Sequence, residues 1–409
     1  MEILNVYLRG NHAGALVSEY GRLQFCYATT YLNLPESQPL SYTLPLRVEP
    51  YTGGEVVAFF SNLLPDESVR VRLAQYLGIS PGNIFALLKR IGEDCAGAVA
   101  LVPAEREARA HSDAEFKVLS EADAHAVLSA LPERPLNVGA EDFHISGAGA
   151  QDKLVACVQN GHIVLPLNGT PSTHIIKPGI PRFPESVFNE FYCMRLAKAC
   201  RISVAECSVL RVRGIPYYVT TRYDRQQESG KVLRLHQEDF CQLLGFEPSV
   251  KYESEGGPRL LQCFQLLREM ALPAADIIEF LRRIIFIFLI GNGDAHAKNF
   301  SILYMGKANR LAPAYDLLST AVYPNLPPKL AMKIDGCNHF DWITRGKLLR
   351  MGEKAGLLNR LVNAEIDKLL AQLSKILVPF TEKMQQSEPS SIYSGIQSGI
   401  AKRILQLKA

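Results

Sequence analysis

The chain lacks the features of a secreted or membrane protein. Its nine cysteines are an odd number and form no Cys-x-x-Cys pair, so we expect neither a disulfide framework nor a zinc knuckle. The longest apolar run, residues 284–290, is far shorter than the roughly 20 residues that cross a bilayer. The first residues, Met1 to Leu4, begin no basic and apolar signal peptide. These absences predict a cytoplasmic protein with no membrane partner.

Several common catalytic signatures are also missing. No serine stands in a Gly-x-Ser-x-Gly elbow, so the sequence gives no basis for a hydrolase. The small-residue loop Ser146–Lys153 lacks the Gly-Lys-Ser/Thr end of a Walker A motif and is not a dinucleotide fingerprint. With 409 residues, 47% of them hydrophobic, the chain can bury a sizeable core in two or three subdomains.

Net charge is small, but it is distributed unevenly. The chain has 44 Lys and Arg against 41 Asp and Glu, and residues 341–409 hold 11 of the basic against 6 of the acidic residues. That piece therefore carries +5 (11 − 6), and the rest carries −2 (33 − 35). The excess indicates a basic carboxyl-terminal face, which is either a solvated helix surface or a patch that contacts DNA phosphates.

The most informative residues are three polar ones. Asp294 and Asn299 are five residues apart, and Asp316 follows in Ala-Tyr-Asp. This is the spacing of a protein-kinase catalytic centre, where one Asp faces the substrate hydroxyl and an Asn and a second Asp hold Mg²⁺ on ATP. A carboxylate can accept a hydroxyl proton, and amide and carboxylate oxygens are the hard ligands that Mg²⁺ prefers.

The residues before Asp294 also suit this interpretation. The apolar run 284–290 would anchor the polar loop in a core, and Gly291 and Gly293 permit a sharp exit from it. On this loop alone, an ordinary turn that caps a buried element is the alternative interpretation.

Upstream motifs favour the kinase interpretation. The small residues of Ser146–Lys153 would let backbone N–H groups approach phosphate oxygens. A strand-like run, residues 154–158, follows, and Lys177 ends a second one, as does the kinase lysine that reaches the α and β phosphates. Glu190 lies on an expected amphipathic helix buried on one side and could pair with Lys177. A flexible hairpin turn and a solvated glutamate are the alternatives for the loop and for Glu190.

The motifs also stand in kinase order. Residues 217–225 form a strand-like run ending in charge, where a kinase would have the hinge that contacts adenine. Loop, lysine strand, glutamate helix, hinge, catalytic loop and metal aspartate thus succeed one another along the chain.

These blocks resemble the signature blocks of the HipA family. The members of that family are bacterial serine/threonine kinase toxins of type II toxin–antitoxin modules. The most specific are Lys251-Tyr252-Glu253-Ser254 and Asp294-x-His-x-Lys-Asn-Phe300. At the amino end, residues 44–46, 59–66 and 91–99 resemble the family's amino-terminal subdomain. The resemblance covers nearly the whole chain.

The resemblance implies roles for individual residues. Asp294 would be the catalytic base, Asn299 and Asp316 the Mg²⁺ ligands, and Glu190 the ion-pair partner of Lys177. Ser146 would be the autophosphorylated serine, whose phosphorylation ejects the loop and silences the kinase. Residues expected at the nucleotide are Ala148, Gly149, Ala150, Gln151, Asp152, Lys153, Lys177, Thr221, Arg222, Tyr223, His296, Lys298, Asn299, Tyr315 and Asp316. Lys347 and Arg350 are expected at the DNA backbone.

The chain departs from the family pattern at three positions. Gly147 occupies a position that is often apolar, Asp152 stands where Glu is common, and Thr221 stands where the hinge often carries Glu. None of these removes a catalytic group, although Gly147 is expected to loosen the loop. His296, considered without the resemblance, is more simply a structural histidine, because no second His or Cys stands at ligand spacing.

The resemblance further implies the partners. ATP and Mg²⁺ would be the cofactors, and a HipB-like helix-turn-helix antitoxin would bind the protein and place it on operator DNA. The substrate would be an aminoacyl-tRNA synthetase, such as the glutamyl enzyme, with translation arrest and persistence as the outcome. The alternative function is a kinase-like corepressor without transfer activity, which only bridges antitoxin and DNA.

The expected fold is α+β, a bilobal kinase-like fold with a small amino-terminal α/β subdomain and a mostly helical carboxyl-terminal lobe. We expect four regions: residues 1–103, a polar crossover at 104–140, a kinase amino-lobe region with the hinge at 141–275, and the helical lobe at 276–409. Within them we expect β-like runs at 3–9, 23–27 and 98–102, a helical stretch at 56–77, and a helix after Ser120 with Asp123 at capping-box spacing. A serine-rich stretch at 387–398 and a short basic helix would end the chain.

Overall fold

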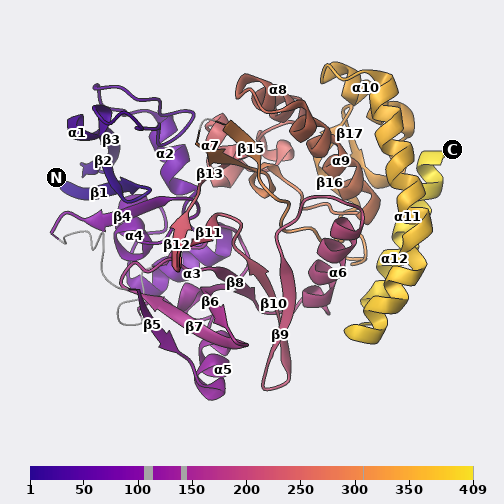
Figure 1. The fold of residues 1–409 in the computed structure, drawn as a ribbon, viewed down its shortest axis with the longest axis horizontal. Helices are drawn as coiled ribbons and strands as arrows, with labels where there is room; N and C mark the ends of the chain where they lie inside the picture. Colours follow the sequence, from indigo (N-terminus) through magenta and orange to yellow (C-terminus); the bar gives the residue numbers. More distant parts are fainter. Residues whose placement is uncertain (106–113, 140–144, 307, 409) are drawn as a thin grey trace. The chain divides into compact units, whose positions relative to one another are not determined.

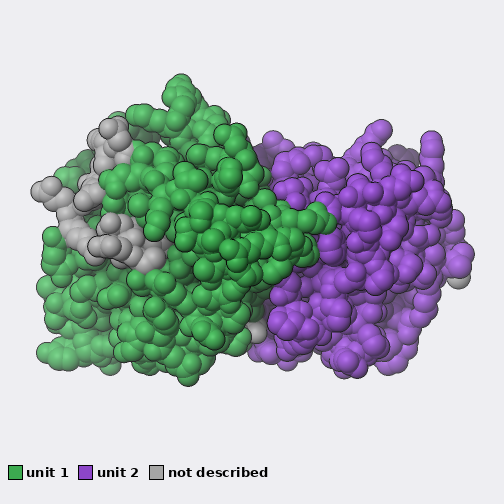
Figure 2. All heavy atoms as spheres, turned by 90° about the horizontal axis from the view of Figure 1, so that it is seen from below, with its two compact units in different colours: residues 1–178, 210–249, 303–305 green, residues 179–209, 250–302, 306–409 purple. Residues whose placement is uncertain are grey.

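The computed structural model describes residues 1–105, 114–139, 145–306 and 308–408. The chain forms two compact units, which Figure 2 colours separately. The first unit comprises Met1–Pro178, Leu210–Ser249 and Leu303–Met305, and the second comprises Gly179–Val209, Val250–Ile302 and Gly306–Ala409. The four expected regions remain a prediction, and residues 106–113 and 140–144, around two of their limits, lie outside the described part.

A four-stranded antiparallel sheet begins the first unit, in the order β3-β2-β1-β4. Along the central strand β1, Leu4, Val6 and Leu8 are buried in alternation, which is the period-2 pattern of a strand with one face on a core. The strands are β1 (Glu2–Leu8), β2 (Asn11–Glu19), β3 (Arg22–Tyr27) and β4 (Val99–Pro103), and they confirm the expected runs within a residue.

A second, six-stranded sheet has the order β5-β7-β6-β8-β10-β9 (Figure 1). Lys177, the last residue of β8, pairs with Tyr218 of β10. One apolar core joins the two sheets and includes Leu4, Phe60 and Ile176. The strands are β5 (Glu115–Val118), β6 (Leu154–Gln159), β7 (His162–Leu167), β8 (His174–Lys177), β9 (Cys207–Val212) and β10 (Ile215–Thr221).

The helices and remaining strands of the first unit cover and connect these sheets. Ser120 accepts a hydrogen bond from the Asp123 N–H at 3.1 Å, which confirms the expected helix start. The elements are α1 (Thr29–Leu32), α2 (Gly54–Ser61), α3 (Glu67–Leu77), α4 (Ile84–Ile91), α5 (Glu121–Ser129), β11 (Arg225–Glu228), β12 (Lys231–Arg234), β13 (His236–Asp239) and α7 (Phe240–Leu244).

The expected helical stretch at 56–77 is wrong in one respect, because it is two helices. Helix α2 ends at Ser61 and α3 begins at Glu67, with Pro65 between them. Proline has no backbone N–H and disfavours a helical residue before it, so it breaks the stretch. The break leaves the Leu63 carbonyl and the Asp66 N–H between the two helices, where both bond to the loop that begins at Ser146.

The second unit is mainly helical. Helices α11 and α12 pack along each other and both contact α9, whose carboxyl-terminal half is buried from Ile284 to Ile290 (Figure 1). The elements are α6 (Ser186–Ala199), α8 (Leu260–Glu269), α9 (Ala274–Ile290), β15 (Ala308–Leu311), β16 (Lys329–Ile334), β17 (Cys337–His339), α10 (Arg345–Lys354), α11 (Asn359–Ser387) and α12 (Ile392–Lys408). Strand β14 (Ser301–Met305) begins in this unit, and its last three residues belong to the first.

Two expectations for this unit are wrong. Helix α6 is not buried on one side only: 10 of its 14 residues are buried, because α12 and other segments pack around it. The serine-rich stretch is largely helical, since α12 begins at Ile392. Its serines fit because their hydroxyls bond to the preceding turn, as Ser398 Oγ does to the Ser394 carbonyl at 2.8 Å.

Candidate active site

The loop of Asp294 begins where the apolar helix α9 ends. Gly291 terminates the helix with a φ of 70°, and its carbonyl accepts hydrogen bonds from the Thr320 and Ala321 N–H groups, each at 3.0 Å. A Cβ at Gly293 would lie 2.4 Å from the Lys329 carbonyl oxygen. Both glycines are therefore required, one by its left-handed backbone and the other by close packing, as the sequence predicts.

Asp294 is half-buried and held from two directions. Its N–H donates to Asn292 Oδ1 at 2.9 Å, which fixes the turn. The Tyr252 hydroxyl donates to its Oδ1 at 2.5 Å. Nothing in the sequence indicates this second contact, because the two residues are 42 positions apart.

Asn299 and Asp316, the two expected metal ligands, are neighbours. Asn299 Nδ2 lies 3.4 Å from Asp316 Oδ2, and its Oδ1 accepts the His296 N–H at 3.2 Å. Asp316 has a φ of 54°, and its carbonyl accepts Asn292 Nδ2 at 3.3 Å. Such strained backbone is typical of functional loops.

This pair fits Mg²⁺, which is commonly held by one or two oxygen ligands together with phosphates and water. Among the described residues, no three His, Cys, Asp or Glu side chains form a metal cluster.

Three more predicted nucleotide residues have structural contacts in this loop. The Tyr315 hydroxyl donates to the Lys298 carbonyl at 2.7 Å and lies 2.7 Å from Ser301 Oγ. The His296 ring stands edge-on to Tyr252, with their centroids 5.0 Å apart. The structure thus gives Tyr315 and His296 packing roles, and their nucleotide contacts remain predictions.

Glu190 is buried on α6. Its neighbour Asn189 exchanges hydrogen bonds with the backbone of Ser319, at 2.8 and 2.9 Å, and so fastens α6 to the segment that follows Asp316. Lys177 belongs to the other unit, and the ion pair between Glu190 and Lys177 remains a prediction.

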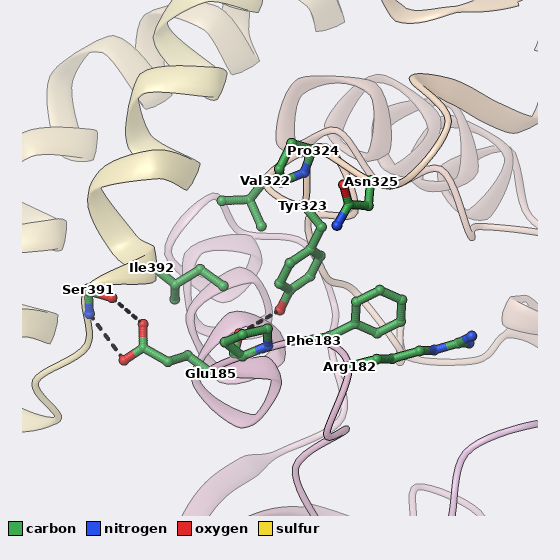
Figure 3. A pocket seen from close by; sticks show the side chains of 10 residues that line it. Arg182, Phe183, Glu185, Val322, Tyr323, Pro324, Asn325, Ser391 and Ile392 are labelled. Atoms are coloured by element: carbon green, nitrogen blue, oxygen red, sulfur yellow. Dashed lines mark hydrogen bonds between the residues drawn. The ribbon is translucent and has the colours of Figure 1, made fainter.

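A pocket of about 350 Å³ also opens in the second unit (Figure 3). The rings of Phe183 and Tyr323 lie in it with centroids 5.0 Å apart, and Ser391 Oγ closes one side by donating to Glu185 at 2.5 Å. None of the predicted site residues lines it.

The small-residue loop Ser146–Lys153, the expected phosphate loop, lies in the first unit and is held by backbone contacts from distant segments. Ser146 is buried; its hydroxyl donates to the Leu63 carbonyl at 2.5 Å, and its N–H donates to the Asp94 carbonyl at 3.2 Å. The Asp66 N–H donates to the Gly149 carbonyl at 3.2 Å. The loop is therefore seated on the break between α2 and α3.

Side chains within the loop are also engaged. Lys153 Nζ donates to the Ala148 carbonyl, and Asp152 forms an ion pair with Arg72 at 2.8 Å. Gln151 Nε2 donates to the Pro178 carbonyl at 3.1 Å. A Cβ at Gly147 would lie 3.0 Å from the side chains of Leu136 and Val155, so glycine here permits close packing; its expected loosening of the loop remains a prediction.

The expected hinge contains a residue with an unexpected environment. Thr221 pairs with His174 at the end of β10, and the Tyr223 hydroxyl donates to Gln237. Arg222 is instead buried, with its guanidinium 2.8 Å from Asp224 and 3.3 Å from Asp94.

Arg222 belongs to a buried ion cluster that sequence reasoning missed. Asp94 Oδ1 also lies 2.7 Å from Arg225 and 3.3 Å from Arg234. Burial alone would raise the pKa of Asp94, but the three guanidinium groups hold it well below its usual range. Burial, with the neighbouring Arg222, lowers the pKa of Arg225 to about 10. The residues of this cluster are Asp94, Arg222, Asp224, Arg225 and Arg234.

Comparison with protein families decides the classification. Residues 145–377 match the HipA-like C-terminal domain, and residues 4–102 match the HipA N-terminal domain. The chain belongs to the HipA family. It is therefore a serine/threonine protein kinase of the HipA type, with the ATP use that a kinase implies.

Individual relatives agree with membership of the HipA family. The chain is 46% identical over 340 residues to Y4mE of Sinorhizobium fredii, which is named as a kinase; the match covers 82% of this chain and 81% of the relative. It is 32% identical to the serine/threonine-protein kinase toxin HipA of Shewanella oneidensis, over 73% of this chain and 70% of that one.

A solved structure confirms the α+β HipA fold. A structure of the Shewanella oneidensis MR-1 HipA with HipB and operator DNA superposes with a TM-score of 0.85, at 26% identity, over 99% of this chain and 97% of that one. In the described residues of this HipA-family chain, no helix is long and apolar enough to cross a membrane. None of the nine cysteines, all of which lie in the described residues, is in a disulfide bond.

The basic face of this HipA-family chain is partly neutralised. Arg350 and Lys354 of α10 both pair with Asp335, each at 2.7 Å, and the pKa of Asp335 is lowered by these hydrogen bonds, that of Lys354 first. Lys347 lies one turn before Arg350 on the same helix.

Proposed function

We propose that this HipA-family kinase transfers the γ-phosphoryl group of ATP, with Mg²⁺, to a serine or threonine hydroxyl. Asp294 would accept the proton of the attacking hydroxyl. Asn299 and Asp316 would hold the Mg²⁺, which supplies charge neutralisation on the phosphates when bound. The observation that carries this assignment is the adjacency of Asn299, which lies on the loop of Asp294, to Asp316: Asn299 Nδ2 is 3.4 Å from Asp316 Oδ2.

The first unit would supply the nucleotide contacts. Lys177 would reach the α and β phosphates, and the loop from Ala148 to Lys153 would cover them through its backbone. Because Arg222 is held in the ion cluster, its contribution to adenine would come from the backbone, together with Thr221 and Tyr223.

Label transfer tests the activity directly. The purified chain is incubated with γ-labelled ATP, with and without Mg²⁺, and protein-bound phosphate is counted beside an Asp294→Asn control. Mg²⁺-dependent labelling that the control lacks supports the proposal. An unlabelled chain that still binds antitoxin and shifts operator DNA would favour the corepressor alternative.

The biological role would be that of a toxin. The Shewanella oneidensis relatives are named as a kinase toxin and as a complex with HipB and operator DNA, which supports a HipB-like antitoxin and an operator for this chain. An aminoacyl-tRNA synthetase would be the substrate, with translation arrest and persistence as the outcome. Phosphoproteomics after induction without antitoxin, compared with induced Asp294→Asn, would identify the target.

Autophosphorylation of Ser146 would silence the kinase. The Ser146 hydroxyl is buried against the Leu63 carbonyl, so a group carrying about −1.5 to −2 charges cannot be seated there and the loop must leave. Phosphorylated protein should bind ATP poorly, and Ser146→Ala should still bind it. Mapping the phosphosite and titrating ATP into each form tests this; undiminished ATP affinity after phosphorylation would refute loop ejection.

A further inference from the structure

Tyr252 provides a contact to Asp294 that the proposed reaction does not yet use. Its hydroxyl donates to Asp294 Oδ1 at 2.5 Å, a charge-assisted hydrogen bond to the group that would act as base. Tyr252 is half-buried, as Asp294 is.

The tyrosine itself has contacts on both its backbone and its ring. Its carbonyl accepts the N–H groups of Glu255 and Gly257, at 3.0 and 2.9 Å, which closes a tight turn. A Cβ at Gly257 would lie 2.0 Å from the Val250 carbonyl oxygen, so this turn demands glycine. On the other side, the ring stands edge-on to His296 at a centroid distance of 5.0 Å and an interplanar angle of 82°.

The segment is also anchored to the neighbouring strand β16. Glu253, the residue after Tyr252, accepts a hydrogen bond from the Lys333 N–H through its Oε2 at 2.6 Å. Turn, ring contact and strand contact together fix where the hydroxyl points. The hydrogen bond to Asp294 is therefore built into the fold and does not depend on a mobile side chain.

We propose that Tyr252 is a positioning residue for phosphoryl transfer: its hydroxyl holds Oδ1 of Asp294, so that Oδ2 faces the acceptor hydroxyl. This inference rests on the proposed function, in which Asp294 is the base. A carboxylate rotates easily about its last torsion, and a base must point at the proton that it accepts. Fixing one oxygen selects the productive rotation, because small misalignments at a reacting group cost large factors in rate.

The opposite role for Tyr252 makes an opposite prediction. If its hydroxyl were a stand-in for the acceptor, it would compete with the substrate, and its removal would speed the reaction. If it positions Asp294, its removal slows the chemical step without changing ATP binding. The sign of the rate change therefore decides between the two roles.

The test uses the full chain and its own phosphate uptake. Initial rates of label incorporation from γ-labelled ATP are measured over a range of ATP concentrations for wild type, Tyr252→Phe, and protein with 3-fluorotyrosine at position 252. Phe keeps the ring against His296 and removes only the hydroxyl, whereas 3-fluorotyrosine keeps both. Tyr192→Phe is the matched control, since it removes a buried hydroxyl that lies 2.7 Å from Thr381 Oγ1 in the same unit.

We expect Tyr252→Phe to lower the maximal rate about tenfold with an unchanged half-saturating ATP concentration, the loss expected for one hydrogen bond to a charged group. The 3-fluorotyrosine protein should recover most of the rate, and Tyr192→Phe should keep it. An unchanged or raised rate in Tyr252→Phe, beside an active wild type, overturns the role of Tyr252 alone. A wild type that takes up no phosphate overturns the proposed function and this inference with it.

Discussion

The phosphate loop of the first unit and the Asp294 loop of the second are both short, polar and glycine-containing, but different interactions hold them. The Asp294 loop follows an apolar helix end, and most of its hydrogen bonds join residues within 30 positions, such as Asn292 to Asp316 and Gly291 to Thr320. The phosphate loop is seated on Leu63, Asp66 and Asp94, and Asp94 is itself fixed by arginines more than 120 positions away. The Asp294 loop is thus held mainly by contacts within one stretch of chain, and the phosphate loop by distant segments that long-range ion pairs fix in turn.

Because of this difference, we expect substitutions in the two loops to change different properties of the protein. Changes in the Asp294 loop should alter phosphate transfer while the fold survives. Changes beneath the phosphate loop should instead alter stability, because the groups there are buried charges that lose their partners.

The largest expected effect is on chemistry. Asp294→Asn removes the proton acceptor but keeps the shape, so label transfer should fall by about 10² to 10⁴-fold while ATP binding remains. Asp316→Asn makes the same change at a proposed Mg²⁺ ligand. It should weaken Mg²⁺-dependent ATP binding, because it removes a ligand charge. Calorimetric ATP titration with and without Mg²⁺ separates the two. Full toxicity of Asp294→Asn without antitoxin would refute the assignment.

The largest expected effect on stability comes from the ion cluster. Asp94→Asn leaves the buried side chains of Arg222 and Arg225, and the half-buried Arg234, without their shared carboxylate, which should cost about 3–5 kcal/mol. Hydrogen–deuterium exchange should rise around residues 145–155 and much less in α9. Asp367→Asn, at an exposed pair with Arg345, is the control and should leave exchange unchanged. If Asp94→Asn accelerates hydrogen–deuterium exchange equally in both units, the ion cluster does not specifically support the phosphate loop.

The same carboxylate gives an acid dependence with a definite sign. Because the pKa of Asp94 is lower in the folded than in the unfolded chain, its stabilising contribution is fully present above about pH 4, the unfolded value, and is lost as the pH falls below it. Wild type should therefore lose stability on acidification more steeply than Asp94→Asn. Parallel curves of thermal midpoint against pH would contradict this.

The sequence predicted the Asp294 loop better than the contacts that hold the phosphate loop. Spacing indicated the neighbourhood of Asn299 and Asp316, and the apolar run with Gly291 indicated how the loop leaves its helix, because all of these residues lie in one stretch of chain, residues 284–316. Asp94 and Arg222 gave no such sign, since no periodicity connects residues 128 positions apart. Arg222 was expected at the nucleotide, and only the fold shows that its side chain is used elsewhere.

A smaller effect concerns a buried glutamate in the first unit. Burial raises the pKa of Glu238 to about 7, although Ser41, Tyr304 and the Tyr42 N–H donate to it. The folded chain therefore binds the proton more tightly, and stability should fall by up to about 3 kcal/mol as the pH rises from about 4.5 to 7. Glu238→Gln should remove this decline, whatever its own stability. Chemical denaturation at pH 5 and pH 8 gives the change in the free energy of unfolding with pH for wild type and for Glu238→Gln. An identical decline in the two proteins would exclude Glu238 as its source.

The smallest expected effect lies on the basic face of α10. Replacing Lys347 and Arg350 with Ala should lower the salt slope of operator binding, measured with the antitoxin, by at most about two, roughly one for each DNA phosphate that is no longer neutralised. The Lys347 change should contribute more, because Arg350 already pairs with Asp335 at 2.7 Å and brings less uncompensated charge to DNA. Kinase activity should be unchanged.

Lys117→Ala on β5, an exposed lysine of the first unit, is the control. A salt slope that neither α10 substitution changes would assign these residues to an ordinary solvated surface, and a larger effect from Arg350 than from Lys347 would mean that its pair with Asp335 opens on DNA.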